Sequence, residues 1–215
     1  MAGLAQPIHV PQGKGAQDAH KGFAGKAKAK LLDARASAGD LEAVAWLQAA
    51  ARAGHLDVLK WLAEQRPVAV ADTGVCAEAA AAGQLEVLRF LQGRNCPINL
   101  AVCAVAASAA GHVHVLQWLA QEHPGCLAGA DMDCLPTIVA AATGQLAVLQ
   151  FLRSLDVPAS WCETTAMAAA KGGQLACLAW LKAQGCPLEV AACIEAAAKH
   201  EHAEVLQFLL TECVW

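Results

Sequence analysis

The sequence predicts an all-α protein, an α-solenoid in which helix–turn–helix units with short loops stack on one another. Three observations lead to this fold class. The chain is 57% apolar and rich in alanine, the strongest helix former. No segment alternates apolar and polar residues as a half-buried strand does. One phrase also recurs, since AAGQLEVLRFL at 81–91 returns as ATGQLAVLQFL at 142–152 and as GGQLACLAWL at 172–181, which is typical of stacked repeats.

Residues 1–28 are predicted to form a disordered basic leader ahead of a repeat domain at 29–215. The first thirty residues hold five lysines against the single acid Asp18, and they lack the apolar core of a secretory signal. The remaining residues include ten basic and eighteen acidic side chains, which disfavours nucleic acid as the main partner. Contact of the leader with RNA or with an anionic membrane, and organelle targeting, stay open alternatives.

Ten cysteines in a chain without a secretory signal indicate thiols in a reducing compartment, so we predict an intracellular, cytoplasmic protein. A membrane location competes with this prediction. Residues 134–152 contain no Asp, Glu, Lys or Arg and nearly suffice to span a bilayer, and part of 95–121 is similar. Both stretches are interrupted by glycine and a polar residue, at Gly144 and Gly111, in register with breaks in charged segments. We therefore predict no membrane partner.

Each repeat contains an anchor residue, which is glycine in every copy but the last. Seven positions after the anchor stands an aromatic residue, eight positions after it stands leucine, and the residues two and five positions after it are apolar. These offsets share one helical face, so each anchor opens a second helix of about two and a half turns whose rings pack in the core. The anchors, spaced by 15, 29, 28, 33, 29 and 28 residues, are Gly39, Gly54, Gly83, Gly111, Gly144, Gly173 and Glu201.

A thin first helix precedes each anchor from Gly54 onward. The residue four positions before the anchor is always alanine, and the residue three positions before it is alanine except at Ser108. Small side chains let the first helices of adjacent units approach closely, and a glycine between helices suits a left-handed turn. A lone unit cannot bury both of its faces, so stability must come from its neighbours.

This pattern resembles the ankyrin repeat over about residues 30–215. The resemblance rests on an AAxxGHLEVLKWL core, seen in Ala50–Ala51 with Gly54–Leu62 and in Ala79–Ala80 with Gly83–Leu91. The linkers GCPLEVAAC at 185–193, NCPINLAVC at 95–103 and VPASWCETT at 157–165 look like those of the family's short-repeat variety. The resemblance implies about six to seven units that form a non-enzymatic scaffold for another protein.

The chain also departs from the ankyrin pattern. The TPLH motif that usually begins the first helix is missing, and LPTIV at 135–139 is only weakly similar to it. Most repeat periods are also shorter than those of the family. We therefore expect blunt loops instead of projecting hairpins, with residues 120–134 forming the most protruding loop. The step from Gly39 to Gly54 is half a period, so helix 40–52 is expected to serve two units at once.

Two sets of residues raise the possibility of a metal site. Cys96 with Cys103 and Cys186 with Cys193 each stand seven positions apart, whereas zinc ligands come in closer pairs. The pairs His112–His114 and His200–His202 have no further ligand nearby in sequence, and the resemblance implies that one histidine of each pair bonds to backbone. We predict no metal and no cofactor, and we keep a thiol- or metal-linked sensor as an alternative function.

No catalytic motif is present. The Gly-Lys-Gly at 13–15 lacks the rest of a phosphate-binding loop, and no Gly-x-Ser-x-Gly occurs. The chain is therefore predicted to be non-enzymatic, without catalytic residues.

The predicted function is binding of another protein by a monomeric repeat array, through a mildly acidic face of loop tips and helix edges. Trp161 is open to two readings, as an interface anchor or as a ring that packs over the next unit. A fragment of a larger ankyrin protein, truncated at the C-terminus, is a further alternative, because LLTECVW ends a second helix without a polar cap. The predicted partner-binding residues are Arg66, Asp72, Arg94, Asn95, Asn99, His123, Asp131, Asp133, Asp156, Trp161, Glu163 and Glu189.

Overall fold

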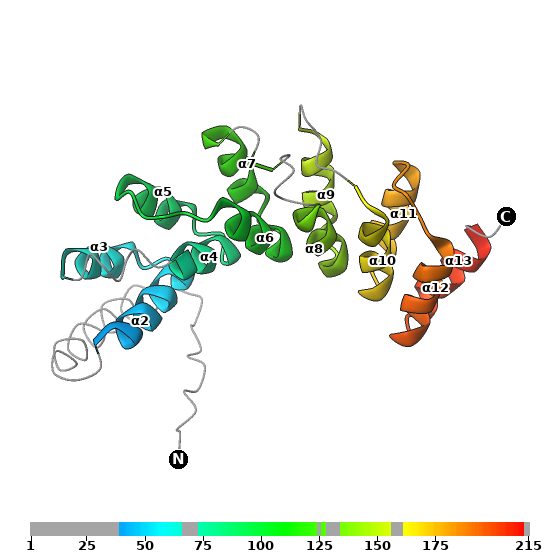
Figure 1. Cartoon of the computed structure of the whole chain (residues 1–215), viewed down its shortest axis with the longest axis horizontal. Helices are drawn as coiled ribbons and strands as arrows, with labels where there is room; N and C mark the ends of the chain where they lie inside the picture. The colour runs from blue at the N-terminus through cyan, green and yellow to red at the C-terminus, as the bar shows by residue number, and fades with distance from the viewer. Residues whose placement is uncertain (1–38, 66–72, 124–125, 128–133, 156–160, 213–215) are drawn as a thin grey trace, which may run out of the picture.

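The computed structural model describes residues 39–65, 73–123, 126–127, 134–155 and 161–212. In these residues it contains twelve helices and no strand, which confirms the all-α prediction (Figure 1). The predicted leader at 1–28 and most of the long loop within 120–134 lie outside the described residues. The helices are α2 (Gly39–Ala53), α3 (Leu56–Gln65), α4 (Thr73–Ala81), α5 (Leu85–Gly93), α6 (Leu100–Ala110), α7 (Val113–Glu122), α8 (Leu135–Thr143), α9 (Leu146–Arg153), α10 (Glu163–Lys171), α11 (Leu175–Ala183), α12 (Val190–Lys199) and α13 (Ala203–Glu212).

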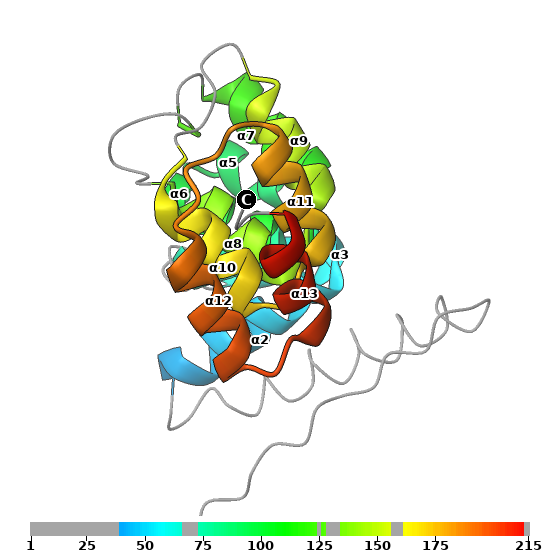
Figure 2. The same cartoon turned by 90° about the vertical axis from the view of Figure 1, so that its right-hand side faces the viewer.

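The helices form consecutive pairs in two layers. The first helices α2, α4, α6, α8, α10 and α12 pack side by side, each against the next. Each second helix packs on its own first helix and touches its counterparts only sparingly. Figure 1 shows the row bending with the first helices on its inner side, and Figure 2 shows α8, α10 and α12 on one side with α9, α11 and α13 on the other. The fifteen-residue α2 lies in the layer of first helices, against α4.

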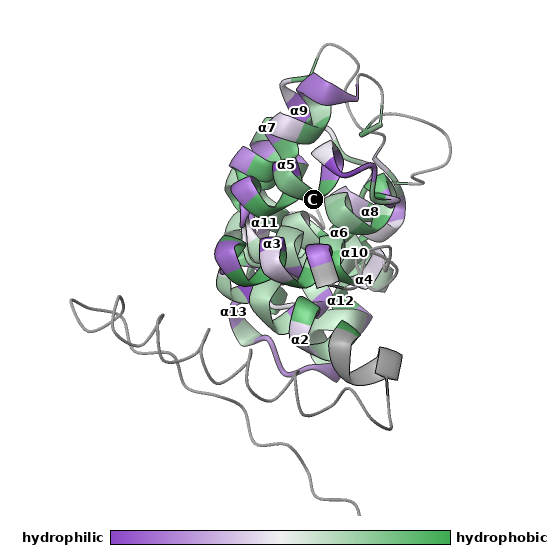
Figure 3. Cartoon of the chain, turned by 90° about the vertical axis from the view of Figure 1, so that its left-hand side faces the viewer, coloured by the Kyte–Doolittle hydropathy of each residue, from purple (hydrophilic) through white to green (hydrophobic). Residues whose placement is uncertain are grey.

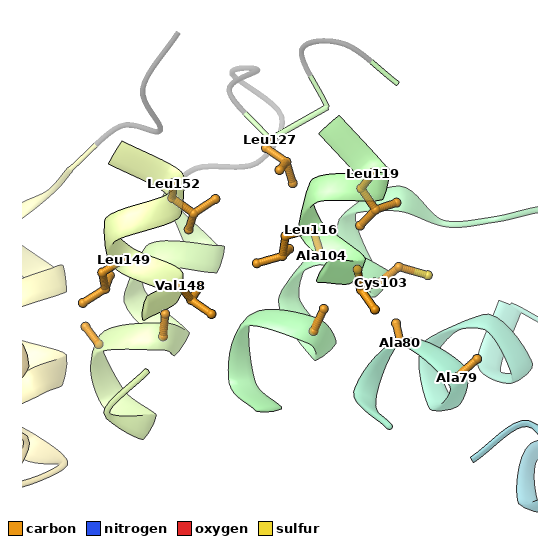
Figure 4. Packing of buried hydrophobic residues seen from close by; sticks show 14 of the residues in the cluster. Ala79, Ala80, Cys103, Ala104, Leu116, Leu119, Leu127, Val148, Leu149 and Leu152 are labelled. Atoms are coloured by element: carbon orange, nitrogen blue, oxygen red, sulfur yellow. The ribbon is translucent and has the colours of Figure 1, made fainter. Parts of the chain in front are cut away.

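Small side chains line the contacts between first helices. The predicted small residues are fully buried in the five pairs from Ala50–Ala51 to Ala169–Ala170, and Ser108 is buried with them. Leucines of the second helices fill the wider space between the layers, as Leu116, Leu119, Leu149 and Leu152 do in Figure 4. The first helices pack closely through small side chains, whereas the second helices carry leucines and need more space. This difference in width between the two layers accounts for the bend of the row.

The recurring aromatic rings border the core instead of filling it. Trp118 is buried, whereas Trp61, Phe90, Phe151, Trp180 and Phe208 are half-buried and pack against the core. The prediction that these rings pack in the core is therefore confirmed for Trp118, whereas the other five rings pack against the core and keep an exposed edge on the layer of second helices.

Left-handed glycines connect the two helices of each pair, as predicted. The φ angles of Gly54, Gly83, Gly111, Gly144 and Gly173 lie between 70° and 82°, a region that favours glycine. Glu201 adopts the same conformation in the last pair, with φ of 60°. The uncharged stretches 134–152 and 95–121 are each divided by such a turn, and no helix of the described residues is long and apolar enough to cross a membrane.

In four pairs the residue after the anchor links the pair to the preceding one. Gln84 Nε2 donates to the carbonyl oxygen of Arg52 (3.3 Å), and His112 Nε2 donates to that of Ala81 (3.1 Å). Gln145 bonds in the same way to Ala109 (3.3 Å), and His202 bonds to Lys171 (2.9 Å). Each acceptor lies two residues before the preceding anchor, so the bond predicted for the histidines reaches the backbone of the neighbouring unit.

These bonds explain a second requirement for glycine at the anchor. A Cβ at Gly83 would lie 2.8 Å from Nδ1 of His112, and one at Gly54 would lie 2.5 Å from Oε1 of Gln84. The anchor must therefore adopt a positive φ and also leave space for the side chain from the next pair.

Replacement of His112 tests the bond between pairs. We expect His112→Ala to lower the free energy of unfolding by about 1 kcal/mol, because the carbonyl of Ala81 loses its donor. His112→Gln should change it by less than about 0.5 kcal/mol, because glutamine makes this bond in other pairs. Urea denaturation followed by circular dichroism measures both values, and equal losses for the two variants would contradict the assignment.

Gly172 tests the close packing of the first helices. Its φ of −83° is allowed for alanine, but a Cβ there would collide with the carbonyl oxygen of Ala142 on α8. We expect Gly172→Ala to cost about 1–3 kcal/mol of stability by overpacking. The control Gly93→Ala meets no atom within 4 Å and should be neutral or slightly stabilising in the same denaturation experiment.

Candidate protein-binding surface

The solvent-facing side of the first helices follows from their register. In α4, α6, α8 and α10 the residues eight, seven, four and three positions before the anchor are buried, and those nine, six, five and two positions before it are not. These two sets occupy opposite faces of a helix. The inner side of the row therefore presents one face of each first helix to solvent.

That face is apolar over α6, α8 and part of α10. Three of the four large hydrophobic residues that are exposed in the described chain lie on it, namely Val102 (45% exposed), Leu135 (47%) and Met167 (36%). Half-buried apolar neighbours extend the patch along α6 and α8. We call this surface the apolar strip, and it consists of Val102, Val105, Leu135, Ile138, Val139 and Met167.

Charged residues are absent from the centre of this surface and present at its two ends. Helices α6 and α8 contain no Asp, Glu, Lys, Arg or His. At one end Arg52 of α2 and Glu78 of α4 form an ion pair of 2.6 Å, and at the other end Lys171 is exposed on α10. Figure 3 shows hydrophilic residues along α5, α7 and α9, whereas α4, α6 and α10 are mostly pale to green.

A contiguous exposed apolar surface is typical of a site that binds another molecule. The sequence prediction placed the binding residues on loop tips and on the outer edges of the first helices, and it did not include the residues of the apolar strip. The signal was present in the uncharged stretches 95–121 and 134–152, which contain α6 and α8 and which also raised the possibility of a membrane location. A comparison of the outward helical positions of adjacent first helices could have found it.

Five of the twelve predicted binding residues lie outside the described chain: Arg66, Asp72, Asp131, Asp133 and Asp156. The other seven occur where a second helix connects to the next first helix, at an edge of the row rather than on the apolar strip. They are Arg94, Asn95, Asn99, His123, Trp161, Glu163 and Glu189.

Several of these residues have local structural contacts. Asn99 caps α6 by accepting a hydrogen bond from the backbone N–H of Val102 (3.1 Å). The guanidinium of Arg94 lies 5.8 Å from the ring centroid of Phe90, and Asn95 has a positive φ of 56°. The ring of His123 packs edge-on against Trp118, with centroids 6.5 Å apart. Glu163 and Glu189 are exposed at the starts of α10 and α12, where the helix dipole favours acids.

Trp161 packs over the next unit, which was one of the two readings of this residue. Its ring centroid lies 5.7 Å from that of Trp180 on α11, and the guanidinium of Arg153 lies 4.6 Å from the Trp161 ring. The side chain is half-buried in this contact. Packing between Arg153 of α9 and Trp180 of α11 gives Trp161 a structural role in joining the units at this edge.

The cysteine pairs and histidine pairs also have structural surroundings. Cys103, Cys186 and Cys193 are buried, and burial raises the pKa of Cys103 and Cys186 to about 11, so Cys103 and Cys186 remain thiols. His114 Nε2 donates to the carbonyl of Gly83 (2.8 Å), next to the bond made by His112. The described residues contain no group of three or more His, Cys, Asp or Glu that could hold a metal ion.

No family model matches the chain, and no curated protein matches it.

Trp161→Ala separates packing from partner binding. We expect this change to lower the free energy of unfolding by about 2 kcal/mol, because the ring loses its contacts with Trp180 and Arg153. The control Glu189→Ala should change stability by less than about 0.5 kcal/mol, because its exposed side chain makes no capping bond. Urea denaturation of both variants checks this, and unchanged stability of Trp161→Ala would contradict the packing role.

Proposed function

We propose that the chain is an ankyrin-like repeat array, an α-solenoid with short loops, that binds another protein on the apolar strip. The single observation that carries this proposal is the exposed apolar surface across α6, α8 and α10, with no charged residue on α6 or α8. Exposed valine, leucine and methionine side chains gain free energy when a partner removes them from water. In this function the array is a monomeric, non-enzymatic, cytoplasmic scaffold that uses no metal and no cofactor.

The chemistry of the strip defines the partner. Its side chains offer neither hydrogen-bond donors nor charges, so affinity must come from burial of apolar area on both sides. The matching partner is a protein segment that presents a row of apolar side chains, with polar residues where it passes Lys171 or the Arg52–Glu78 pair. Nucleic acid does not fit this surface, because phosphates need basic side chains.

The helical backbone also favours binding. The strip is built on helices whose opposite faces are fully buried, so its residues are held in place before a partner arrives. Binding to a preformed surface avoids the entropy cost of ordering a loop. The sequence also predicted binding to a preformed surface, but it placed that surface on the loop tips and helix edges.

Charge insertion on the strip tests the proposal. Proteins captured by the wild-type chain from its source cells are identified, and each is then purified and titrated against wild type, Leu135→Asp and Leu210→Asp by calorimetry. Leu210 is a matched control, because it is similarly exposed (53%) but lies on α13, away from the strip. We expect Leu135→Asp to raise the Kd at least about tenfold, while Leu210→Asp leaves it unchanged.

Circular dichroism must show equal helicity for the three proteins. A purified partner that binds Leu135→Asp as tightly as wild type would contradict the proposed surface.

A further inference from the structure

Two cysteines occupy corresponding positions at the starts of adjacent first helices. Cys134 is the N-cap of α8, and Cys162 is the N-cap of α10. Because α8 and α10 pack side by side, the two N-caps meet at the linker edge of the row. Both side chains are half-buried, so they combine a fixed environment with access from solvent.

The Cys134 side chain lies beside the Cys162 thiol, because α8 and α10 pack side by side and Cys134 is one of the groups that lower the pKa of that thiol. Sγ of Cys162 also lies 2.8 Å from Oγ1 of Thr164 and 3.4 Å from Oγ1 of Thr165. The backbone N–H of Cys162 donates to Oγ1 of Thr165 (3.5 Å), which completes the cap of α10. The Cys162 sulfur is thus surrounded by two hydroxyls and a second thiol, each of which is able to donate to it.

These surroundings favour the reactive form of Cys162. Burial raises the pKa of the Cys162 thiol, but hydrogen bonds from Cys134, Thr164 and Thr165 outweigh burial, so the pKa lies below its ordinary value. The thiolate is the nucleophilic form of cysteine, and a position at a helix N-terminus stabilises it further.

The neighbouring cysteines lack this combination. Cys186 is buried, its Sγ faces the carbonyl oxygens of Cys162 (4.0 Å) and Pro187 (3.7 Å), and burial raises its pKa to about 11. Cys126 is half-buried like Cys162, but its Sγ donates to the carbonyl of Leu119 (3.5 Å) and burial raises its pKa. Cys126 is therefore a matched control, because its side chain is half-buried like that of Cys162 but its thiol pKa is not lowered.

We propose that Cys134 and Cys162 form a dithiol that hydroperoxides oxidise to an intrachain disulfide. The Cys162 thiolate attacks the terminal peroxide oxygen, so that an S–O bond forms and the O–O bond breaks. The other oxygen leaves as hydroxide or alkoxide and takes up a proton. Cys134 then attacks the Cys162 sulfur, an S–S bond forms, the S–O bond breaks, and hydroxide leaves as water with the Cys134 proton. The two sulfurs give up two electrons in total, and the peroxide accepts them.

The disulfide would join α8 to α10 covalently at the linker edge. It does not depend on binding at the apolar strip, so the dithiol and the proposed function succeed or fail separately. In the described residues no disulfide joins the cysteines, which corresponds to the reduced form.

Peptide mapping of the full chain tests the dithiol. The reduced protein is treated with one equivalent of hydrogen peroxide, remaining thiols are alkylated, and the products are digested with trypsin. The tryptic peptide 154–171 contains Cys162 as its only cysteine. We expect this peptide to appear linked to Cys134 of peptide 95–153, with loss of two titratable thiols per chain. Linkage to Cys186, linkage between two chains, or unlinked Cys162 would each overturn the proposal.

Serine variants identify the role of each sulfur. Cys162→Ser should abolish disulfide formation and slow peroxide consumption at least about tenfold, and it should fold because serine is a favoured N-cap residue. Cys134→Ser should consume peroxide at the wild-type rate but retain a Cys162 sulfenic acid that dimedone traps. The control Cys126→Ser should behave as wild type. Wild-type disulfide yield in Cys134→Ser, or slowed oxidation in Cys126→Ser, would overturn the assignment.

Discussion

The close approach of neighbouring first helices is the constraint on which the rest of the structure depends. Two small residues per first helix are fully buried from Ala50–Ala51 to Ala169–Ala170. Such burial occurs only when another unit lies alongside. The last pair shows this dependence, because Leu206 is half-buried in the described chain, whereas Leu178 at the same position of the preceding pair is fully buried. Stability therefore resides between units as much as within them.

This constraint leaves one face of each first helix without a structural role. The buried positions of α6 and α8 take up one side of each helix, and the opposite side can carry any residue without disturbing the stack. Polar residues there would favour solubility, and Glu195 and Lys199 on α12 follow that preference. On α6 and α8 the same positions are apolar, so hydrophobic side chains are exposed to water. A binding partner that covers these side chains would remove their surface from water.

Polar contacts across the unit boundaries complement the apolar packing. The carbonyl oxygens near the end of a first helix have no partner within that helix, and an N–H from the next unit supplies one. Gln84 and His112 both donate to such a carbonyl oxygen although their side chains differ. Each side chain passes over the anchor glycine of the preceding pair and places its Nε2 N–H next to the carbonyl. At the opposite ends of the first helices, the N-caps Cys134 and Cys162 lie at the starts of the adjacent helices α8 and α10, and Trp161 packs against Trp180 of α11.

The sequence by itself determined the helices, the left-handed turns and most of the buried positions. These features depend on the period of apolar residues along one chain segment, and the 28–29-residue spacing repeats that period reliably. Only the tertiary structure decided which surfaces meet. The bond from His112 to Ala81 spans 31 residues, the apolar strip joins three helices, and Trp161 folds onto Trp180. Such contacts depend on lateral packing between units, and a one-dimensional period contains no information on which outward side chains become neighbours.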